Sequence, residues 1–206
     1  MAAIIFDFDG TIADSFDYIV DFLAKQAKLE PLSAEQKQKL RGLSMVTIAR
    51  QLGHARWRLL GLFLNGRRRM GATVRHVQPF AEMPELIRKL HAEGHELFIV
   101  TSNKARTVRV FLHTQQLHTY FLQIYGGVGL FGKAPALRGL LRDQHIDRKD
   151  AVYIGDELRD VQAAQSVGMR VVAVTWGFAQ PATLAAKKPT GLANTPAELM
   201  AILEEL

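Results

Sequence analysis

The chain has 206 residues, of which 48% are hydrophobic and 22% charged, and it has no cysteine. This length suits one domain with a modest insertion, and the missing cysteine excludes a disulfide scaffold, a cysteine-ligated metal site and a thiol nucleophile. A formal net charge of +6 favours an anionic partner, either nucleic acid or a small phosphorylated substrate, and composition leaves both open.

Four apolar runs predict short buried strands, at residues 3–6, 97–100, 151–154 and 171–174, with a weaker candidate at 122–125. Helix signals fill the stretches between them. Pro84 suits a first helical turn, Gly94 suits a helix end, and Thr195 with Glu198 predicts a capping box that opens the last helix. Apolar strands that alternate with helices predict an α/β fold, a doubly wound parallel sheet with helices on both faces.

Residues 15–78 contain no buried-strand run and indicate helices throughout. Ser33 with Gln36 predicts another capping box inside this stretch. We therefore expect a helical domain at residues 15–78, inserted into an α/β core formed by residues 1–14 and 79–206. The run of Arg67, Arg68 and Arg69 in this insert is typical of a solvated helix end or loop.

Polar residues follow nearly every predicted strand, where ligands of an open parallel α/β sheet bind. They are Asp7 and Asp9, then Thr101, Ser102 and Asn103, and later Asp156 and Asp160, with Lys133 ahead of the helix that leads to Asp156. If the chain stays extended between them, Asp7 and Asp9 project from one side with Cα atoms roughly 6–7 Å apart.

Acidic side chains this close together need a cation. The carboxylates of Asp7, Asp9 and Asp156 would repel one another, and hard oxygen ligands favour Mg²⁺. Asp160 lies four residues after Asp156 and would share a helix face with it. Glu157 is expected to point elsewhere, as a solvated acid of the first helical turn.

The glycines of residues 127–133 match a dinucleotide-binding pattern and nearly match a phosphate-binding P-loop. The dinucleotide interpretation leaves Asp7, Asp9 and Thr101 without a role. The P-loop interpretation fails because Ala134 lacks the hydroxyl that would hold Mg²⁺.

An Asp-x-Asp-Gly-Thr motif at residues 7–11, a hydroxyl at Thr101, Lys133 and a Gly-Asp-x-x-x-Asp motif at residues 155–160 occur in this order. The set resembles the haloacid dehalogenase-like (HAD) hydrolase superfamily over nearly the whole chain. The insert after the first motif looks like the small cap of the phosphoglycolate phosphatase and phosphomutase branch. The resemblance implies a Rossmann-like core with a helical cap, and a phosphatase that uses an aspartyl-phosphate intermediate.

The resemblance also implies a role for each motif residue. Asp7 would be the nucleophile, and Asp9 would protonate the leaving oxygen and later take a proton from water. Thr101 would hydrogen-bond a phosphoryl oxygen, and Lys133 would neutralise charge on the nucleophile and on the transferring group.

The same resemblance implies a metal site and a substrate site. Mg²⁺ would be held by Asp7, Asp156 and the backbone carbonyl of Asp9, with Asp160 acting directly or through water. The substrate would be bound by Thr101 and Lys133 together with Ser102, Asn103 and Arg41. Arg41 belongs to residues 41–44, which resemble the cap turn that faces the catalytic centre in relatives.

The expected activity is Mg²⁺-dependent hydrolysis of a small phosphomonoester, with phosphoglycolate as the first candidate by resemblance. A phosphomutase of the β-phosphoglucomutase type shares every core residue named and stays open as an alternative. A non-enzymatic phospho-acceptor is less favoured, since bacterial receiver domains carry their acceptor on the third strand.

The expected partner is a small phosphorylated metabolite. Nucleic acid is not expected, because no recognition module accompanies Arg67–Arg69. A membrane partner is not expected either, since the apolar runs fall far short of the roughly 20 residues that span a bilayer. Asp7 interrupts the apolar stretch that a signal peptide would need, so we expect a soluble cytoplasmic protein, a monomer or a homodimer.

Overall fold

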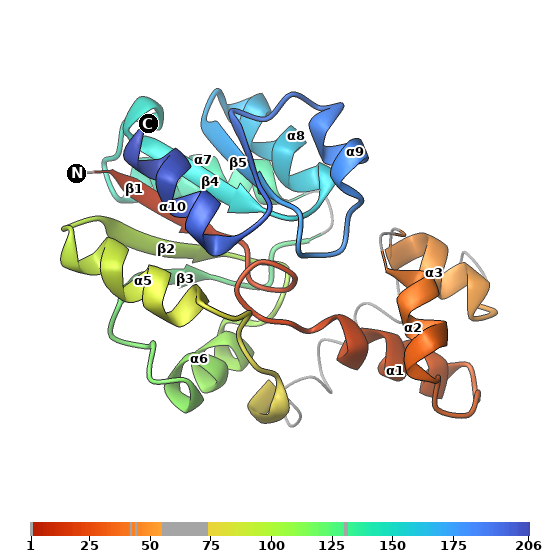
Figure 1. Cartoon of the computed structure of the whole chain (residues 1–206). Helices are drawn as coiled ribbons and strands as arrows, with labels where there is room; N and C mark the ends of the chain where they lie inside the picture. The colour runs from red at the N-terminus through yellow and green to blue at the C-terminus, as the bar shows by residue number, and fades with distance from the viewer. Residues whose placement is uncertain (1, 42, 44, 55–73, 130–131) are drawn as a thin grey trace.

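The computed structural model describes residues 2–41, 43, 45–54, 74–129 and 132–206 (Figure 1). The predictions that concern Gly42, Ser44 and Arg67–Arg69 fall outside these residues. The described chain forms an α/β core around a sheet, with helices of the segment 15–78 beside it.

The sheet has six strands in the described chain, all parallel and in the order β3-β2-β1-β4-β5-β6. Their bounds are β1 Ala3–Phe6, β2 Glu96–Val100, β3 Phe121–Tyr125, β4 Ala151–Gly155, β5 Arg170–Val174 and β6 Gly191–Ala193. The five predicted strands are confirmed. The sequence did not predict β6, because its three residues include a glycine and form no apolar run.

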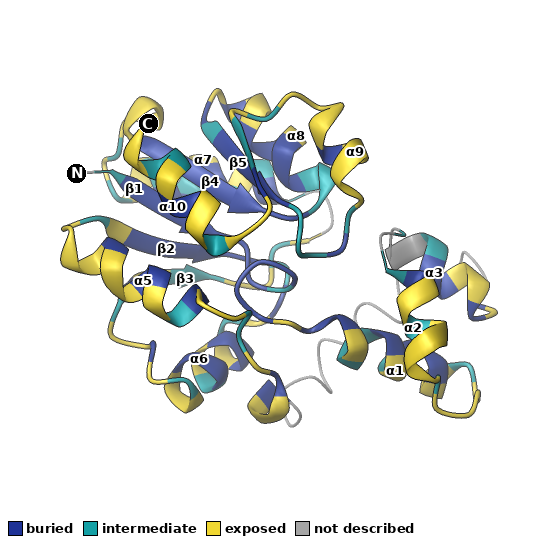
Figure 2. Cartoon of the chain, in the orientation of Figure 1, coloured by how far each residue is buried: buried dark blue, intermediate teal, exposed yellow. Residues whose placement is uncertain are grey.

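Helices cover both faces of the sheet because successive strand side chains point to opposite sides. Ile4 and Phe6 of β1 pack with the helices α5 Met83–Ala92, α6 Ala105–Thr114 and α10 Pro196–Glu204. Ala3 and Ile5 pack with α7 Lys133–Asp143, α8 Leu158–Val167 and α9 Pro181–Ala185 on the other face. Figure 2 shows the strands β1, β2, β4 and β5 as the buried layer between these helices. The predicted doubly wound parallel sheet is confirmed.

The helix ends follow the predicted signals with one difference. Pro84 lies in the first turn of α5, and Gly94 follows that helix with φ of +85°. Thr195 Oγ accepts the Glu198 N–H at 3.1 Å at the start of α10. The Glu198 carboxylate accepts the Asn194 N–H at 2.8 Å instead of the Thr195 N–H, so only half of the capping box forms.

The described chain also has two short 3-10 helices, η2 Val74–His76 near the end of the segment 15–78 and η3 Arg148–Asp150 in the core. The strand order places β1 between β2 and β4. The chain leaves β1 toward the face of α5 and leaves β4 toward the face of α8, so the connections diverge there. Ligands of α/β sheets bind at the carboxyl ends of the two strands beside such a divergence, which are β1 and β4 here.

The segment 15–78 contains the helices α1 Phe16–Gln26, α2 Ala34–Leu40 and α3 Met45–Gln51 in its described part. Ser33 and Gln36 cap α2 reciprocally, as predicted, with the Gln36 N–H 3.2 Å from Ser33 Oγ. These helices share a hydrophobic cluster of their own. Its members are Phe16, Val20, Leu23, Ala24, Leu40, Ile48, Ala49 and Leu52, joined by Phe178 from the core.

The chain enters and leaves this segment through two stretches that run side by side. The Asp14 N–H donates to the Gln78 carbonyl at 2.9 Å, and the Phe80 N–H donates to the Ile12 carbonyl at 3.0 Å. Ala13 and Pro79 form an isolated antiparallel bridge between these contacts. The three helices therefore join the core through one paired connection, which Figure 1 shows below the sheet edge.

Candidate active site

Three carboxylates meet at the carboxyl ends of β1 and β4. Asp7 directly follows β1, Asp156 directly follows β4, and Asp160 lies in the first turn of α8. One oxygen from each lies within 4.8 Å of the others, and all three residues are buried. The backbone N–H of Asp7 still donates to the Ile154 carbonyl at 2.8 Å, which fixes Asp7 beside β4.

Lys133 brings an ammonium into this group. It begins α7, is only 3% exposed, and places Nζ 2.7 Å from Asp7 Oδ2 and in contact with Asp160 Oδ1. Burial alone would lower the pKa of Lys133, but the nearby carboxylates of Asp160 and Asp7 raise it above its usual value. The two carboxylates therefore favour the charged form of the Lys133 side chain.

Burial raises the pKa values of two of these carboxylates. Burial raises the pKa of Asp7 to about 7, although Lys133 opposes the change. Burial also raises the pKa of Asp156 well above its usual range, with Glu157 and Asp160 adding to the effect. When all three carboxylates are ionised, they and the one ammonium carry a formal charge of −2. Buried oxygens of this charge fit a hard divalent cation such as Mg²⁺.

Two glycines allow the backbone to close around Asp156. Gly10 has φ of +80°, and a Cβ there would lie 2.2 Å from Asp156 Oδ2. A Cβ on Gly177 would lie 2.3 Å from the same oxygen. The carboxylate also accepts the Thr11 hydroxyl at 3.1 Å and the Phe178 N–H at 2.7 Å. Any side chain at either glycine would displace this carboxylate.

Asp9 lies apart from the three-carboxylate group. Its Oδ2 accepts the Asn103 side-chain N–H at 3.2 Å, and its Oδ1 is buried without a hydrogen-bond partner among the described residues. Burial raises the pKa of Asp9, against the opposing effects of the Ser15 and Asn103 side chains. A buried carboxyl with a raised pKa suits proton transfer.

The residues after β2 form a turn beside Asp9. Thr101 is fully buried, and its Oγ1 accepts the Asn103 N–H at 3.0 Å, which leaves the hydroxyl proton free to donate. Asn103 is buried, and its Oδ1 accepts the Lys104 N–H at 2.8 Å. Ser102, between them, is half-buried. The turn therefore offers one hydroxyl donor from a rigid position.

Arg41 makes its described contacts inside the insert. Its guanidinium lies 3.0 Å from Asp17 Oδ1 and 4.5 Å above the centre of the Phe16 ring. The side chain is about one third exposed, at 34%. Nothing in the described structure joins Arg41 directly to the three carboxylates, so it stands apart from the other predicted site residues.

Comparisons with known proteins agree with this geometry. Residues 4–174 match the family described as haloacid dehalogenase-like hydrolase. The chain belongs to this family. A phosphoglycolate phosphatase from Synechococcus elongatus is 34% identical over 209 residues, which cover 100% of this chain and 99% of the relative. The predicted HAD-type phosphatase class is therefore confirmed, and the non-enzymatic phospho-acceptor is set aside.

Solved structures of HAD-like proteins share the fold. A predicted phosphatase from Clostridium acetobutylicum has a TM-score of 0.82 at 22% identity, covering 100% of this chain and 99% of its own. A haloacid dehalogenase-like protein from Streptococcus pneumoniae has a TM-score of 0.80 at 23% identity, covering 98% of each chain.

The described chain contains no helix long and apolar enough to cross a bilayer.

The HAD-like site contains one ion pair that the sequence interpretation missed. Glu157 was expected to be solvated, which is wrong, because its side chain is only 16% exposed and pairs with Arg159. Its backbone N–H donates to Asp160 Oδ2 at 3.0 Å, which turns the residue inward at the start of α8. Arg159 in turn lowers the pKa values of Asp7 and Asp9, against the larger effect of burial.

Tyr153 and Phe178 also contact the acids of the site, although neither belongs to a sequence motif. The Tyr153 hydroxyl, from the apolar strand β4, donates to the Val100 carbonyl at 3.2 Å and lies 3.4 Å from Asp160 Oδ1. Phe178 supplies the N–H that holds Asp156. A tyrosine within a buried strand is the one signal that the sequence offered, since its hydroxyl needs a buried partner.

Proposed function

We propose that this chain is a Mg²⁺-dependent phosphatase that hydrolyses a small phosphomonoester through a phosphorylated Asp7. The observation that carries the proposal is the buried group of Asp7, Asp156 and Asp160 with Lys133 against two of its members. These carboxylates and the Asp9 carbonyl would hold Mg²⁺, which when bound neutralises charge on the phosphoryl oxygens.

In the first step an oxygen of Asp7 attacks phosphorus while the bond from phosphorus to the leaving oxygen breaks. This attack needs the ionised carboxylate. Lys133 favours ionisation, because it opposes the burial that raises the pKa of Asp7 to about 7. The raised pKa of Asp9 keeps a proton available, which passes to the leaving oxygen.

In the second step Asp9, now ionised, accepts a proton from water. The water oxygen bonds to phosphorus, the bond from phosphorus to Asp7 breaks, and inorganic phosphate leaves with Asp7 restored. Asn103 holds one oxygen of Asp9 at 3.2 Å and leaves the other without a partner among the described residues. One carboxyl group can therefore serve both proton transfers without turning.

Substrate binding divides between the core and the insert in this proposal. The free proton of the buried Thr101 hydroxyl, with the nearby groups of Ser102 and Asn103, suits a phosphoryl oxygen. Lys133 would bind the same phosphoryl group. Arg41 would direct guanidinium donors not engaged by Asp17 toward the rest of the substrate.

Phosphoglycolate is the proposed substrate, as a member of the class of small phosphorylated carboxylic acids. The support is the relative from Synechococcus elongatus, which matches along the whole chain and is named a phosphoglycolate phosphatase. The +6 net charge favours an anionic substrate. A small phosphorylated metabolite is accordingly the proposed partner.

The test measures phosphate release from phosphoglycolate, from other small phosphorylated metabolites and from p-nitrophenyl phosphate, with Mg²⁺ and with chelator. The wild-type enzyme should release phosphate only with Mg²⁺. Asp7→Asn should abolish turnover, while Asp143→Asn, at an exposed surface ion pair, should not. Retained turnover by Asp7→Asn would falsify the mechanism. Positional isomers of a sugar phosphate, formed without phosphate release, would instead favour the mutase.

A further inference from the structure

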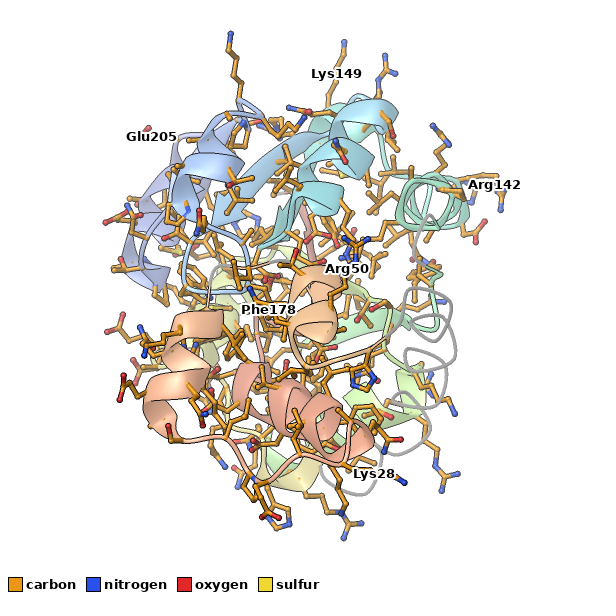
Figure 3. The ribbon with its side chains drawn as sticks, turned by 90° about the vertical axis from the view of Figure 1, so that its right-hand side faces the viewer. Lys28, Arg50, Arg142, Lys149, Phe178 and Glu205 are labelled. Atoms are coloured by element: carbon orange, nitrogen blue, oxygen red, sulfur yellow. The ribbon has the colours of Figure 1, made fainter. Side chains whose placement is uncertain are left out.

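Phe178 belongs to two parts of the molecule at once. It lies in the loop between β5 and α9, which is part of the core. Its side chain is 4% exposed and packs in the hydrophobic cluster of the insert, with its ring centre 6.0 Å from that of Phe16. Figure 3 shows Phe178 where the helices of the insert meet the core.

The backbone of Phe178 holds the carboxylate of Asp156. Its N–H donates to Asp156 Oδ2 at 2.7 Å, a charge-assisted bond between buried groups. The next residue, Ala179, donates its N–H to the Asp156 carbonyl at 3.3 Å. The loop therefore donates hydrogen bonds to both the side chain and the backbone carbonyl of Asp156.

The same loop also contacts Thr11, whose hydroxyl binds the other oxygen of Asp156. Trp176 Nε1 donates to the Thr11 carbonyl at 3.1 Å, and the Thr11 hydroxyl donates to Asp156 Oδ1 at 3.1 Å. Gly177 packs so closely that a Cβ there would lie 2.3 Å from Asp156 Oδ2. Both oxygens of Asp156 thus depend on the position of this loop.

We propose that Phe178 is a positioning residue that couples the packing of the helical insert to the orientation of the Asp156 carboxylate, and thereby to the affinity for the divalent cation. The ring and the N–H belong to one residue, so a ring that leaves its place among the insert helices carries the N–H away from Asp156. This inference rests on the proposed function only in that Asp156 is a ligand of the cation.

A purely structural role predicts a different outcome, and Leu23 supplies the matched control. Leu23 is equally buried, at 4% exposed, in the same hydrophobic cluster. It lies in α1, outside the loop between β5 and α9 that holds Asp156. Leu23→Ala should therefore destabilise the insert, as Phe178→Ala does, without changing how Asp156 is held.

The experiment measures Mn²⁺ binding directly, from the electron paramagnetic resonance signal of free Mn²⁺, for the wild type, Phe178→Ala, Phe178→Leu and Leu23→Ala. Phe178→Ala should weaken binding about tenfold, which corresponds to ~1.4 kcal/mol. Phe178→Leu should recover most of the affinity. Leu23→Ala should lower Tm but keep Kd within about twofold of the wild type. A folded Phe178→Ala that binds Mn²⁺ as tightly as the wild type would overturn the inference.

A second variant keeps the test decisive if Phe178→Ala does not fold. Phe16→Ala removes the ring against which Phe178 packs and leaves the loop sequence intact. It should weaken Mn²⁺ binding about threefold, and unchanged binding would count against the inference. In the activity assay of Phe178→Ala, the Mg²⁺ concentration for half-maximal rate should rise in step with Kd, while KM at saturating Mg²⁺ should stay nearly constant.

The two proposals fail in different ways. If the wild type binds Mn²⁺ but releases no phosphate from any phosphomonoester, the proposed function is wrong and the coupling can still be measured. If the wild type is an active phosphatase and Phe178→Ala keeps its Kd, the coupling is wrong and the proposed function stands.

Discussion

Lys133 Nζ lies 2.7 Å from Asp7 Oδ2, although 126 residues separate the two in the chain. The pair forms because β1 ends beside the start of α7 at the carboxyl edge of the sheet. An ammonium buried against the proposed nucleophile favours the ionised form of that carboxylate and would stabilise the negative charge that develops during phosphoryl transfer.

Lys133→Met should therefore lower kcat by about 10²- to 10³-fold, the usual loss when one charge-stabilising donor is removed. Asp7 should also become harder to ionise, because Lys133 lowers its pKa. The pH at which kcat/KM reaches half of its maximum should move upward. Lys149→Met is the matched control, since Lys149 is exposed (Figure 3), and it should leave both quantities unchanged.

The raised pKa of Asp7 predicts a stability that depends on pH in chelator. The folded pKa of about 7 lies above the ordinary value of 3.8, so the folded state binds the extra proton between these values. Unfolding free energy should be highest below about pH 4 for this group and should fall, by up to a few kcal/mol, as pH rises toward 7.

Thermal unfolding at several pH values, in chelator and in Mg²⁺, measures this effect. Mg²⁺ should raise Tm more at pH 8 than at pH 6, because the cation competes with protons for the carboxylates. Asp7→Asn should flatten the pH dependence in chelator. The same slope in wild type and Asp7→Asn would show that Asp7 is not the titrating group.

Asp9→Asn should separate two kinds of substrate. An alkyl phosphate such as phosphoglycolate has a poor leaving group that needs protonation, so its kcat/KM should fall about 10²- to 10⁴-fold. p-Nitrophenyl phosphate, whose leaving group needs little protonation, should lose about tenfold or less. Because kcat/KM reports the steps up to departure of the leaving group, equal losses on both substrates would argue against Asp9 as the acid.

Gly177→Ala should inactivate the enzyme without any change of charge. The added Cβ would lie 2.3 Å from Asp156 Oδ2, so the carboxylate must move. We expect a loss of kcat of at least about 10²-fold and weaker Mn²⁺ binding. Gly139→Ala is the control, because a Cβ there meets nothing within 4 Å in the middle of α7. It should stabilise the helix by about 0.5–1 kcal/mol.

Much of the fold was predictable because parallel strands buried on both faces are apolar along their whole length. The central strands β1 and β4 satisfy this pattern completely. The acids were predictable for a related reason, since Asp7 and Asp156 end apolar runs that tolerate no charge. A carboxylate at such a position is costly unless it serves a purpose.

The remaining features depend on packing between distant segments. β6 has only three residues at the edge of the sheet, so it carries no periodic pattern. In the sequence Glu157 resembles an ordinary acid at the start of a helix. Only the structure shows that its side chain is mostly buried and paired with Arg159. Phe178 follows no motif, and its role comes from a backbone N–H, which is the same in every residue except proline.

The paired connection at Asp14–Gln78 and Ile12–Phe80 has a consequence for how such enzymes diversify. Both ends of the helical segment leave the core at one point, so a substituted segment of different length or sequence need not disturb the strand order. Specificity can then evolve while the phosphoryl chemistry stays constant. Any replacement would still have to supply apolar side chains around the Phe178 ring, since that residue's N–H orients the Asp156 carboxylate.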